Sequence, residues 1–542
     1  MSSRLLPLPG NRLYLQRATA ALAAVLACSA VAAHSPAATT QIAAHPPMGW
    51  NSYDAYGTTI TEAQFRANAR WLSQHLAHYG WRYAVIDAEW FVRNPTPNGN
   101  SPASALVLDS YGRYVPATNR FPSAAGGAGF KPLADYVHSL GLKFGIHILR
   151  GIPREAVTRN LPIEASRYTA AEAVDIHSSC PWNADNYGVD SRRPAGQAYY
   201  DSIARLYASW GVDFIKADCI ANHPYAAAEI RMLSTSLRGS GRDMILSLSP
   251  GPAPIEKLPQ LRRYANMWRI SNDVWDLWHS PNPYPQGVGD QFPRAARWAP
   301  LAEPGGWPDD DMLALGALRP APGWGKPRRS QLTHAEQRTY MTLWCIVRSP
   351  LFLGANLTAI DPWTMSLLDN PEVISVDQRS AGAHQALSAG GTVVWVSRPQ
   401  GERADIDWYV AVFNVRARER TVSLPWKSLS FTGRRYAIRD LWNRRDLGAA
   451  GMLRVQLPAH GAALYLISPR GAAGLCCARK SAARARPHRA TAPPTFRPVN
   501  LQVVGREQRA IAADIGPSAA GEGYLSVSVS RVFSSVVRAE AA

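Results

Sequence analysis

The sequence predicts an α/β fold, a (β/α)8 TIM barrel followed by a C-terminal antiparallel β-sandwich. Stretches with helical periodicity repeatedly end at a glycine and lead into a short apolar strand. Polar residues follow several of these strands at their carboxyl ends, which is typical of a barrel more than of a doubly wound sheet. From about Val376 onward, short strands occur without intervening helices. No Gly-x-Gly-x-x-Gly follows any of the strands, which weakens a dinucleotide-binding alternative.

The predicted barrel spans residues 42–378. Its first strand lies within residues 45–53, and a capping box at Thr61 and Gln64 begins a helix that continues to Gly80. Two further helices end at Gly141 and Gly211, where the next strands begin. The other strands are predicted at residues 81–87, 142–147, 212–217, 243–249, 267–271 and 351–356.

The predicted sandwich spans residues 379–468. Gly, Pro and charged turns separate its apolar segments, which is typical of antiparallel strands. It carries no constellation of acids or histidines, so we expect it to pack against the barrel, with sugar binding as a minority alternative. Its strands are predicted at residues 392–396, 408–413, 421–424, 453–457 and 463–467.

The N-terminal segment, residues 1–36, has the pattern of a signal peptide. Arg4, Arg12 and Arg17 precede an apolar run at residues 18–33 that ends in small residues. We therefore expect export, to the periplasm or outside the cell. No other segment approaches about 20 apolar residues, so no membrane association is expected.

The C-terminal segment, residues 469–542, is basic and rich in alanine and proline. This composition predicts a disordered tail, with polyanion binding as a weak alternative. The net charge of +18 would suggest an acidic partner, but much of the excess lies at the two ends of the chain. We expect no nucleic-acid partner, and the sequence carries no signal of oligomeric state.

The cysteines do not form a disulfide-rich scaffold. Cys28 lies in the predicted signal peptide, and Cys476 and Cys477 lie in the predicted tail. Export makes one bridge between Cys180 and Cys219 possible, although the sequence does not establish it. No spacing resembles a zinc site, and no cofactor is expected.

The strand at residues 212–217 leads into the first candidate for chemistry. Strand alternation places Lys216 and Asp218 on one face. A neighbouring cation lowers the pKa of a carboxyl group, and an ionised, oriented carboxylate is what a covalent nucleophile needs. The alternative is that Asp218 only caps the next helix or turns the chain.

A second acid, Asp273, follows the strand at residues 267–271 and shares a face with Arg269. A second acid at the same barrel mouth could supply the partner for two-carboxylate chemistry, which uses one ionised nucleophile and one protonated acid. The alternative is an ion pair between Arg269 and Asp273 that only holds the loop.

Five motifs occur in the order found in the α-galactosidases (melibiases) of glycoside hydrolase family 27. The chain resembles this family from about His45 to Gln378, and the sandwich also fits the family architecture. The motifs are Pro-Met-Gly-Trp-Asn-Ser at residues 47–52, Gly-Leu-Lys-Phe-Gly-Ile at 141–146, Ile-Lys-Ala-Asp at 215–218, Trp-Arg-Ile-Ser-Asn-Asp at 268–273 and Gly-Gly-Trp-Pro-Asp-Asp-Asp-Met-Leu at 305–313.

The resemblance implies a retaining exo-glycosidase that needs no cofactor and hydrolyses terminal non-reducing α-D-galactosyl residues of a galactoside or a related oligosaccharide or polysaccharide. It implies a double displacement with Asp218 as the nucleophile and Asp273 as the general acid/base. Trp50 would stack on the sugar. The other substrate-binding residues that the resemblance implies are Asp87, His147, Lys216, Ser249, Arg269 and Asp311.

Three departures from the family pattern concern the sugar rather than the catalytic pair. His147 replaces a tyrosine, Ser249 belongs to an altered motif, and Ala88 replaces an acid that in the family faces the C6 hydroxymethyl group of galactose. β-L-Arabinopyranose lacks that group, so a β-L-arabinopyranosidase is a close alternative. Strand alternation places Glu89 on the face of Asp87, where it could replace the missing acid.

Two other classes of protein remain open. A secreted carbohydrate-binding protein without catalysis would need the pocket but not both Asp218 and Asp273. A metal-dependent hydrolase is suggested by the run of acids at residues 309–311, but no histidines accompany it.

Overall fold

The computed structural model describes residues 42–96, 105–319, 326–401, 403–404 and 406–469. The predicted signal peptide, and the predicted tail from residue 470 onward, lie outside these residues. No helix within them is both long and apolar enough to cross a membrane.

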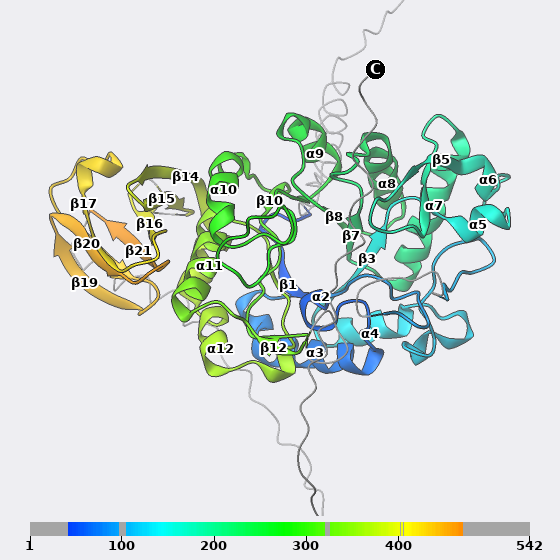
Figure 1. Ribbon diagram of the computed structural model, residues 1–542, viewed down its shortest axis with the longest axis horizontal. Coiled ribbons are helices and arrows are strands. Elements are labelled where there is room, and N and C mark those ends of the chain that lie inside the picture. Colours follow the sequence, from blue (N-terminus) through cyan, green and yellow to red (C-terminus); the bar gives the residue numbers. More distant parts are fainter. Residues whose placement is uncertain (1–41, 97–104, 320–325, 402, 405, 470–542) are drawn as a thin grey trace, which may run out of the picture. The chain divides into compact units, whose positions relative to one another are not determined.

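Eight parallel strands form one sheet in the order β10-β9-β8-β7-β3-β2-β1-β13. Figure 1 labels β10, β8, β7, β3 and β1 of this sheet. Seven of them coincide with predicted strands. The eighth, β10, was not predicted because it is short and contains a proline. The strands are β1 Met48–Asn51, β2 Tyr83–Ile86, β3 Lys143–Leu149, β7 Phe214–Asp218, β8 Ile245–Leu248, β9 Met267–Arg269, β10 Trp307–Asp309 and β13 Leu351–Leu353.

The two ends of this sheet meet just beyond β10. Leu313 forms an isolated parallel bridge with Leu353. Its backbone N–H donates to the carbonyl of Phe352 at 2.7 Å, and its carbonyl accepts from Gly354 N at 3.1 Å. These contacts close the sheet on itself, so the predicted (β/α)8 barrel is confirmed.

The helices alternate with the strands as predicted. The capping box of Thr61 and Gln64 begins α3, and Gly211, in a left-handed conformation with φ 81°, ends α7 and turns the chain into β7. The helices are α2 Tyr53–Tyr56, α3 Glu62–His75, α4 Lys131–Ser139, α7 Pro194–Trp210, α8 Ala227–Gly239, α9 Leu258–Tyr264, α10 Phe292–Trp298, α11 His334–Val347, α12 Pro362–Leu368 and α13 Pro371–Gln378.

Two small sheets are inserted into the barrel. The first has the strand order β4-β6-β5 and lies between β3 and α7 in the chain, and the second pairs β11 with β12. Neither was predicted. Their elements are β4 Ile152–Pro153, α5 Arg154–Thr158, α6 Ala170–Ala173, β5 Val174–Ser179, β6 Asn186–Val189, β11 Ala317–Leu318 and β12 Arg328–Arg329.

Strand alternation divides the barrel residues into two apolar groups. Those facing outward, such as Ile215 and Ala217, belong to the large core that includes helix residues. Those facing inward form a separate apolar plug that fills the interior of the barrel. The plug consists of Val85, Phe214, Ile245, Met267, Trp307 and Phe352.

The C-terminal domain is antiparallel, with a six-stranded sheet in the order β14-β15-β16-β21-β18-β19 and a two-stranded sheet of β17 and β20. Valines of β15 and β16 and leucines of β17 and β20 share one apolar core between the sheets. The predicted β-sandwich is therefore confirmed. Its strands are β14 Ser380–Ala389, β15 Thr392–Pro399, β16 Trp408–Asn414, β17 Arg420–Pro425, β18 Tyr436–Asp440, β19 Arg445–Ala450, β20 Met452–Leu457 and β21 Ala462–Ser468.

Candidate active site

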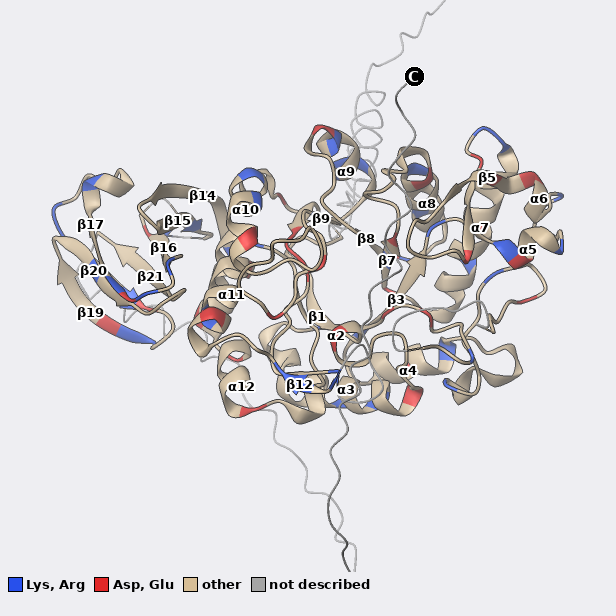
Figure 2. Cartoon of the chain, in the orientation of Figure 1, with Lys and Arg blue, Asp and Glu red and all other residues tan. Residues whose placement is uncertain are grey.

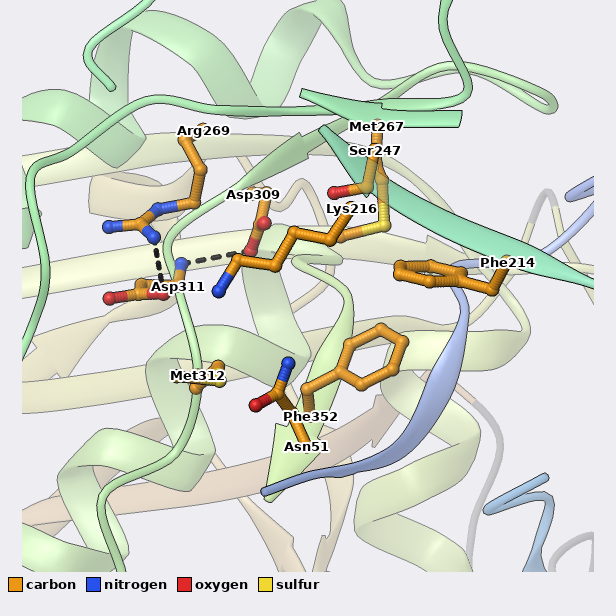
Figure 3. Close-up of a pocket in the computed structure, with 10 residues that line it drawn as sticks. All are labelled: Asn51, Phe214, Lys216, Ser247, Met267, Arg269, Asp309, Asp311, Met312 and Phe352. Atoms are coloured by element: carbon orange, nitrogen blue, oxygen red, sulfur yellow. Dashed lines mark hydrogen bonds and ion pairs between the residues drawn. The ribbon is translucent and has the colours of Figure 1, made fainter. Parts of the chain in front are cut away.

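Polar side chains lie directly next to the apolar plug inside the barrel. Figure 3 shows the polar ends of Lys216, Arg269 and Asp311 on one side of a small pocket and the rings of Phe214 and Phe352 on the other. The carboxyl ends of parallel strands meet at one mouth of a barrel, so residues from distant motifs converge there.

Asp218 ends β7 and its carboxylate has three neighbouring hydrogen-bond partners. Its Oδ1 accepts from the backbone N–H of Cys219 at 2.6 Å and from the Ser249 hydroxyl at 3.2 Å. Its Oδ2 lies 3.4 Å from Nε2 of His147. Burial alone would raise the pKa of Asp218, but His147, the charge of Lys216 and the Cys219 N–H together hold it below its usual value. The carboxylate is therefore ionised at neutral pH.

Asp87 follows β2 and is the direct partner of Lys216. Its Oδ2 accepts from Lys216 Nζ at 2.9 Å and from Asn51 Nδ2 at 2.7 Å. Burial would raise the pKa of Asp87, but the charges of Lys216 and His147 and these hydrogen bonds lower it well below its usual range. Lys216 thus contacts Asp87 directly and acts on Asp218 through its charge.

Asp273 lies four residues beyond the end of β9, and 37% of its side chain is exposed. The buried Arg269 guanidinium contacts Asp273 Oδ1 at 3.1 Å and Asp311 Oδ1 at 2.7 Å. The ion pair that we weighed as an alternative is therefore present. It does not bury Asp273, whose carboxyl group remains accessible for proton transfer.

Asp311 is held opposite Asp273 by an unusual backbone. Its φ of 88° lies in the left-handed region, and its Oδ2 accepts from the Val274 N–H at 2.7 Å. Burial raises the pKa of Asp311 to about 7, with Arg269 opposing the rise and Asp273 adding to it. Arg269 thus forms ion pairs with both Asp273 and Asp311.

The prediction that Trp50 stacks on the sugar is wrong. Its ring is fully buried, lies 5.5 Å from that of Phe65 on α3 and donates its indole N–H to Ala355 O at 2.7 Å. Asn51 lines the pocket inside the barrel, so alternation along β1 turns Trp50 outward.

Tyr53, which sequence reasoning missed, lies among the acids instead. Burial raises the pKa of its phenol, and the charges of Asp273, Asp87 and Asp218 raise it further. Tyr53 is therefore within electrostatic reach of both candidate catalytic groups. Strand alternation could not have identified it, because β1 ends at Asn51 and Tyr53 is the first residue of α2.

A disulfide joins Cys180 to Cys219, directly beside Asp218. The bridge that the sequence left open is therefore formed. Arg150 supports it by donating to Cys219 O at 2.7 Å, to Ser179 O at 3.1 Å and to the Glu229 carboxylate at 2.6 Å. The turn that carries Asp218 is thus fixed to the inserted sheet.

This arrangement has the parts that two-carboxylate chemistry requires. One carboxylate is ionised and held by three partners, a second carboxyl group is accessible to solvent, and Arg269 and Lys216 balance the surrounding charge. Among the described residues, no three His, Cys, Asp or Glu side chains are grouped to hold a metal ion. Fold and site together define the class of a two-carboxylate glycoside hydrolase.

Comparison with known proteins supports the assignment of this chain to the glycoside hydrolases. Residues 189–379 match the family model "Alpha galactosidase A", and residues 389–467 match "Alpha galactosidase C-terminal beta sandwich domain". An α-galactosidase of Cyamopsis tetragonoloba is 28% identical over 78% of this chain and 86% of its own length.

Two solved structures are more similar in sequence. A family 27 β-L-arabinopyranosidase from Geobacillus stearothermophilus, solved with arabinose, is 44% identical, with a TM-score of 0.75 over 79% of this chain and 98% of its own. A protein described as a putative α-N-acetylgalactosaminidase from Bacillus halodurans is 40% identical, with a TM-score of 0.69 over 78% and 97%. The chain belongs to the α-galactosidase family, glycoside hydrolase family 27.

Proposed function

We propose that this glycoside hydrolase releases terminal non-reducing α-D-galactosyl residues by a retaining double displacement. Asp218 attacks C1 while protonated Asp273 gives its proton to the departing glycosidic oxygen. Asp273 then deprotonates a water molecule, which hydrolyses the glycosyl ester on Asp218. The observation that carries the proposal is the ionised, three-partner environment of Asp218 at the same barrel mouth as the accessible Asp273.

The positions of the remaining residues support a sugar held by its hydroxyl groups. Lys216 is paired with Asp87 and Arg269 with Asp311, and Tyr53 lies within electrostatic reach of Asp87 and of both proposed catalytic groups. Charged groups that hydrogen-bond sugar hydroxyls contribute most when they are ordered beforehand, and these are all paired with one another.

A β-L-arabinopyranosidase is the second candidate, and Ala88 favours it. A charge-assisted hydrogen bond to the 6-hydroxyl, worth about 1.5–3 kcal/mol, is lost when this position is alanine. Strand alternation does not place Glu89 on the face of Asp87, because β2 ends at Ile86. The backbone of Glu89 has a φ of 65°. Its charge acts on Arg120: burial lowers the pKa of Arg120 to about 10, and the negative charge of Glu89 opposes this lowering. The 44% identity to an arabinopyranosidase supports the same candidate.

One pair of assays decides between the sugars. We would compare kcat/KM on nitrophenyl α-D-galactoside and nitrophenyl β-L-arabinopyranoside for the wild type and Ala88→Asp. A wild type that prefers the galactoside supports the first candidate. A strong preference for the arabinoside that moves toward the galactoside in Ala88→Asp establishes the second. No turnover of either, with sugar binding intact, would indicate a binding protein and overturn both.

The same experiment can test the stereochemistry. NMR of the first-formed sugar should show the anomer of the substrate, because two inversions at C1 restore the configuration. An inverted first product would contradict the assignment of Asp218 as a nucleophile.

We also propose that the protein is exported. The predicted signal peptide and the Cys180–Cys219 disulfide support this, because disulfides persist in oxidising compartments. Expression with and without residues 1–36, followed by fractionation, tests it. Retention of the full chain inside the cell in its unprocessed form would contradict export.

A further inference from the structure

An exposed tryptophan, Trp182, lies in the loop that joins β5 to β6 of the inserted sheet. Its side chain is 49% exposed, and no other tryptophan that the structure describes is as exposed. Tryptophan is a large apolar side chain that proteins usually bury, and exposed aromatic rings are enriched where a ligand or partner binds. The position of Trp182 relative to the proposed nucleophile indicates what it binds.

Both ends of this loop are fixed beside the proposed nucleophile. At the first end, the disulfide joins Cys180 to Cys219, the residue that follows Asp218, with 5.8 Å between the two Cα atoms. At the second end, the buried Asn186 donates from Nδ2 to Arg150 O at 3.0 Å. Arg150 N in turn donates to Asp218 O at 3.1 Å. The loop is therefore anchored on both sides of Asp218.

These anchors place Trp182 at the mouth of the barrel. Two residues of extended chain span at most about 7 Å, so the Cα atom of Trp182 lies within about 13 Å of that of Cys219. This is a distance that a disaccharide can span. β3 and β7 both end here, and the carboxyl ends of the strands form the face of the barrel that carries the site.

The exo mode of action determines which part of a substrate reaches this residue. In the proposed function the terminal sugar is held by the buried acids, Lys216 and Arg269. Every other sugar of the substrate then belongs to the leaving group, which extends outward from the site. An exposed ring at the mouth of the barrel is therefore available to the leaving group.

The surroundings of Trp182 favour a neutral ligand. Residues 176–184 include no Lys, Arg, Asp or Glu. Figure 2 shows charged segments of the insertion on α5 and α6 instead. The side chain of Asn183 accepts from the Asp185 N–H at 2.8 Å, which orders the chain next to Trp182. A neutral sugar suits this segment, because its C–H face can cover an indole and its hydroxyl groups can bond to neutral polar groups.

We propose that Trp182 is a stacking surface for a neutral sugar of the leaving group. This inference rests on the proposed function, because it takes the buried acids as the site of the terminal sugar. The leaving group is still present in the transition state, so the contact should raise kcat/KM. Since the disulfide and Asn186 already hold the loop, little ordering is needed when the sugar binds.

The test uses three substrates with the same terminal sugar, the one that the nitrophenyl assays identify. The first is its glycosyl fluoride, and the second is its trifluoroethyl glycoside, whose leaving group has an acidity similar to that of a sugar hydroxyl. Both leaving groups are too small to cover an indole. The third is a disaccharide in which the terminal sugar is joined to glucose. We expect the wild type to hydrolyse the disaccharide with a kcat/KM about five- to thirtyfold above that of the trifluoroethyl glycoside.

Trp182→Ala should bring this ratio close to one and leave kcat/KM on the two small substrates unchanged. Trp182→Tyr should keep part of the ratio, because an aromatic face remains. Leu447→Ala is the matched control, since it removes an apolar side chain that is 44% exposed, but on β19 of the sandwich. The control should keep the wild-type ratio.

The outcomes separate the two proposals. Failure of the wild type to hydrolyse the glycosyl fluoride would overturn the proposed function itself. Hydrolysis of the fluoride with a wild-type ratio near one, or a ratio that Trp182→Ala does not change, would overturn the stacking surface alone. An unchanged ratio together with loss of self-association in Trp182→Ala, measured by sedimentation, would show that a second copy of the chain covers this residue instead. If Trp182→Ala did not fold, the wild-type ratio and Trp182→Tyr would still decide.

Discussion

Asp218 and Asp273 lie at the mouth of the same barrel in contrasting surroundings. Asp218 ends a central strand, has three hydrogen-bond partners and is followed at once by a disulfide. Asp273 lies on a loop, is contacted by one guanidinium group and is more exposed, at 37% of its side chain against 21%. A nucleophile must stay ionised and fixed, whereas an acid/base must exchange its proton with substrate and water. The fixed, hydrogen-bonded surroundings of Asp218 suit the first role, and the more exposed position of Asp273 suits the second.

The largest expected effect is that of removing the proposed nucleophile. Asp218→Ala should lower kcat by about 10⁴–10⁶-fold on every substrate, since no other group can form the glycosyl ester. Azide should restore turnover of an aryl glycoside and give a glycosyl azide of inverted configuration, because the anion attacks from the vacated face. Circular dichroism should match the wild type. An azide product of retained configuration would contradict the role of Asp218.

The next effect is that of removing the proposed acid/base. Asp273→Ala should lower kcat/KM by about 10²–10⁴-fold on a disaccharide, whose leaving group needs a proton, and far less on the glycosyl fluoride. Azide should now give a product of retained configuration, because it attacks the glycosyl ester on Asp218. Equal losses on both substrates would mean that Asp273 is not the proton donor.

Removing the disulfide should affect stability more than chemistry. The bridge closes a sequence separation of 39 residues, and Cys180→Ser should lower the free energy of unfolding by about 3–4 kcal/mol. Urea unfolding measures this difference. The control is Cys345→Ala at the free, buried cysteine, for which we expect about 1 kcal/mol. Equal losses in the two variants would show that the bridge adds no stability.

The smallest effect concerns the pH dependence. His147→Phe removes the hydrogen bond and charge that lower the pKa of Asp218, so this pKa rises. Because Asp218 must be ionised, activity is then lost at a higher pH as the solution is acidified, and the acidic limb of kcat/KM moves to higher pH. His138→Phe is the control, since His138 pairs with Asp213 instead. An unchanged acidic limb in His147→Phe would show that this limb of the kcat/KM profile does not report the ionisation of Asp218.

The sequence predicted most of what depends on periodicity and motif. Seven barrel strands and the convergence of Asp218, Asp273, Asp87 and Arg269 followed from apolar strands that end in polar residues. It did not reveal β10, since Trp307, Pro308 and Asp309 are too few and too proline-rich to resemble a strand. β18 and β19 were missed because neither alternates: β18 begins with three buried residues in a row, and β19 is exposed along almost its whole length.

Within the site, the errors came from carrying over a role by motif, or extending strand alternation, without regard to where the strand ends and which face it presents. The family resemblance assigned sugar stacking to Trp50, although alternation turns this residue outward, and Tyr53, which lies near the acids, was overlooked. Glu89 was placed by alternation that β2 does not sustain, since the strand ends at Ile86. The partner of Lys216 also depends on neighbouring strands, and no single strand could have predicted it.

The backbone pairing that closes the barrel is short. Between β3 and β7 the chain is paired through five residues in register, whereas two backbone hydrogen bonds at Leu313 join the other side. Local opening therefore breaks fewer bonds at Leu313 than beside Asp218, and amides there should exchange with solvent sooner. Asp311 lies two residues before this seam. Local opening of the barrel at Leu313 would thus displace Asp311 and its partner Arg269, while β7 and Asp218 stay in place.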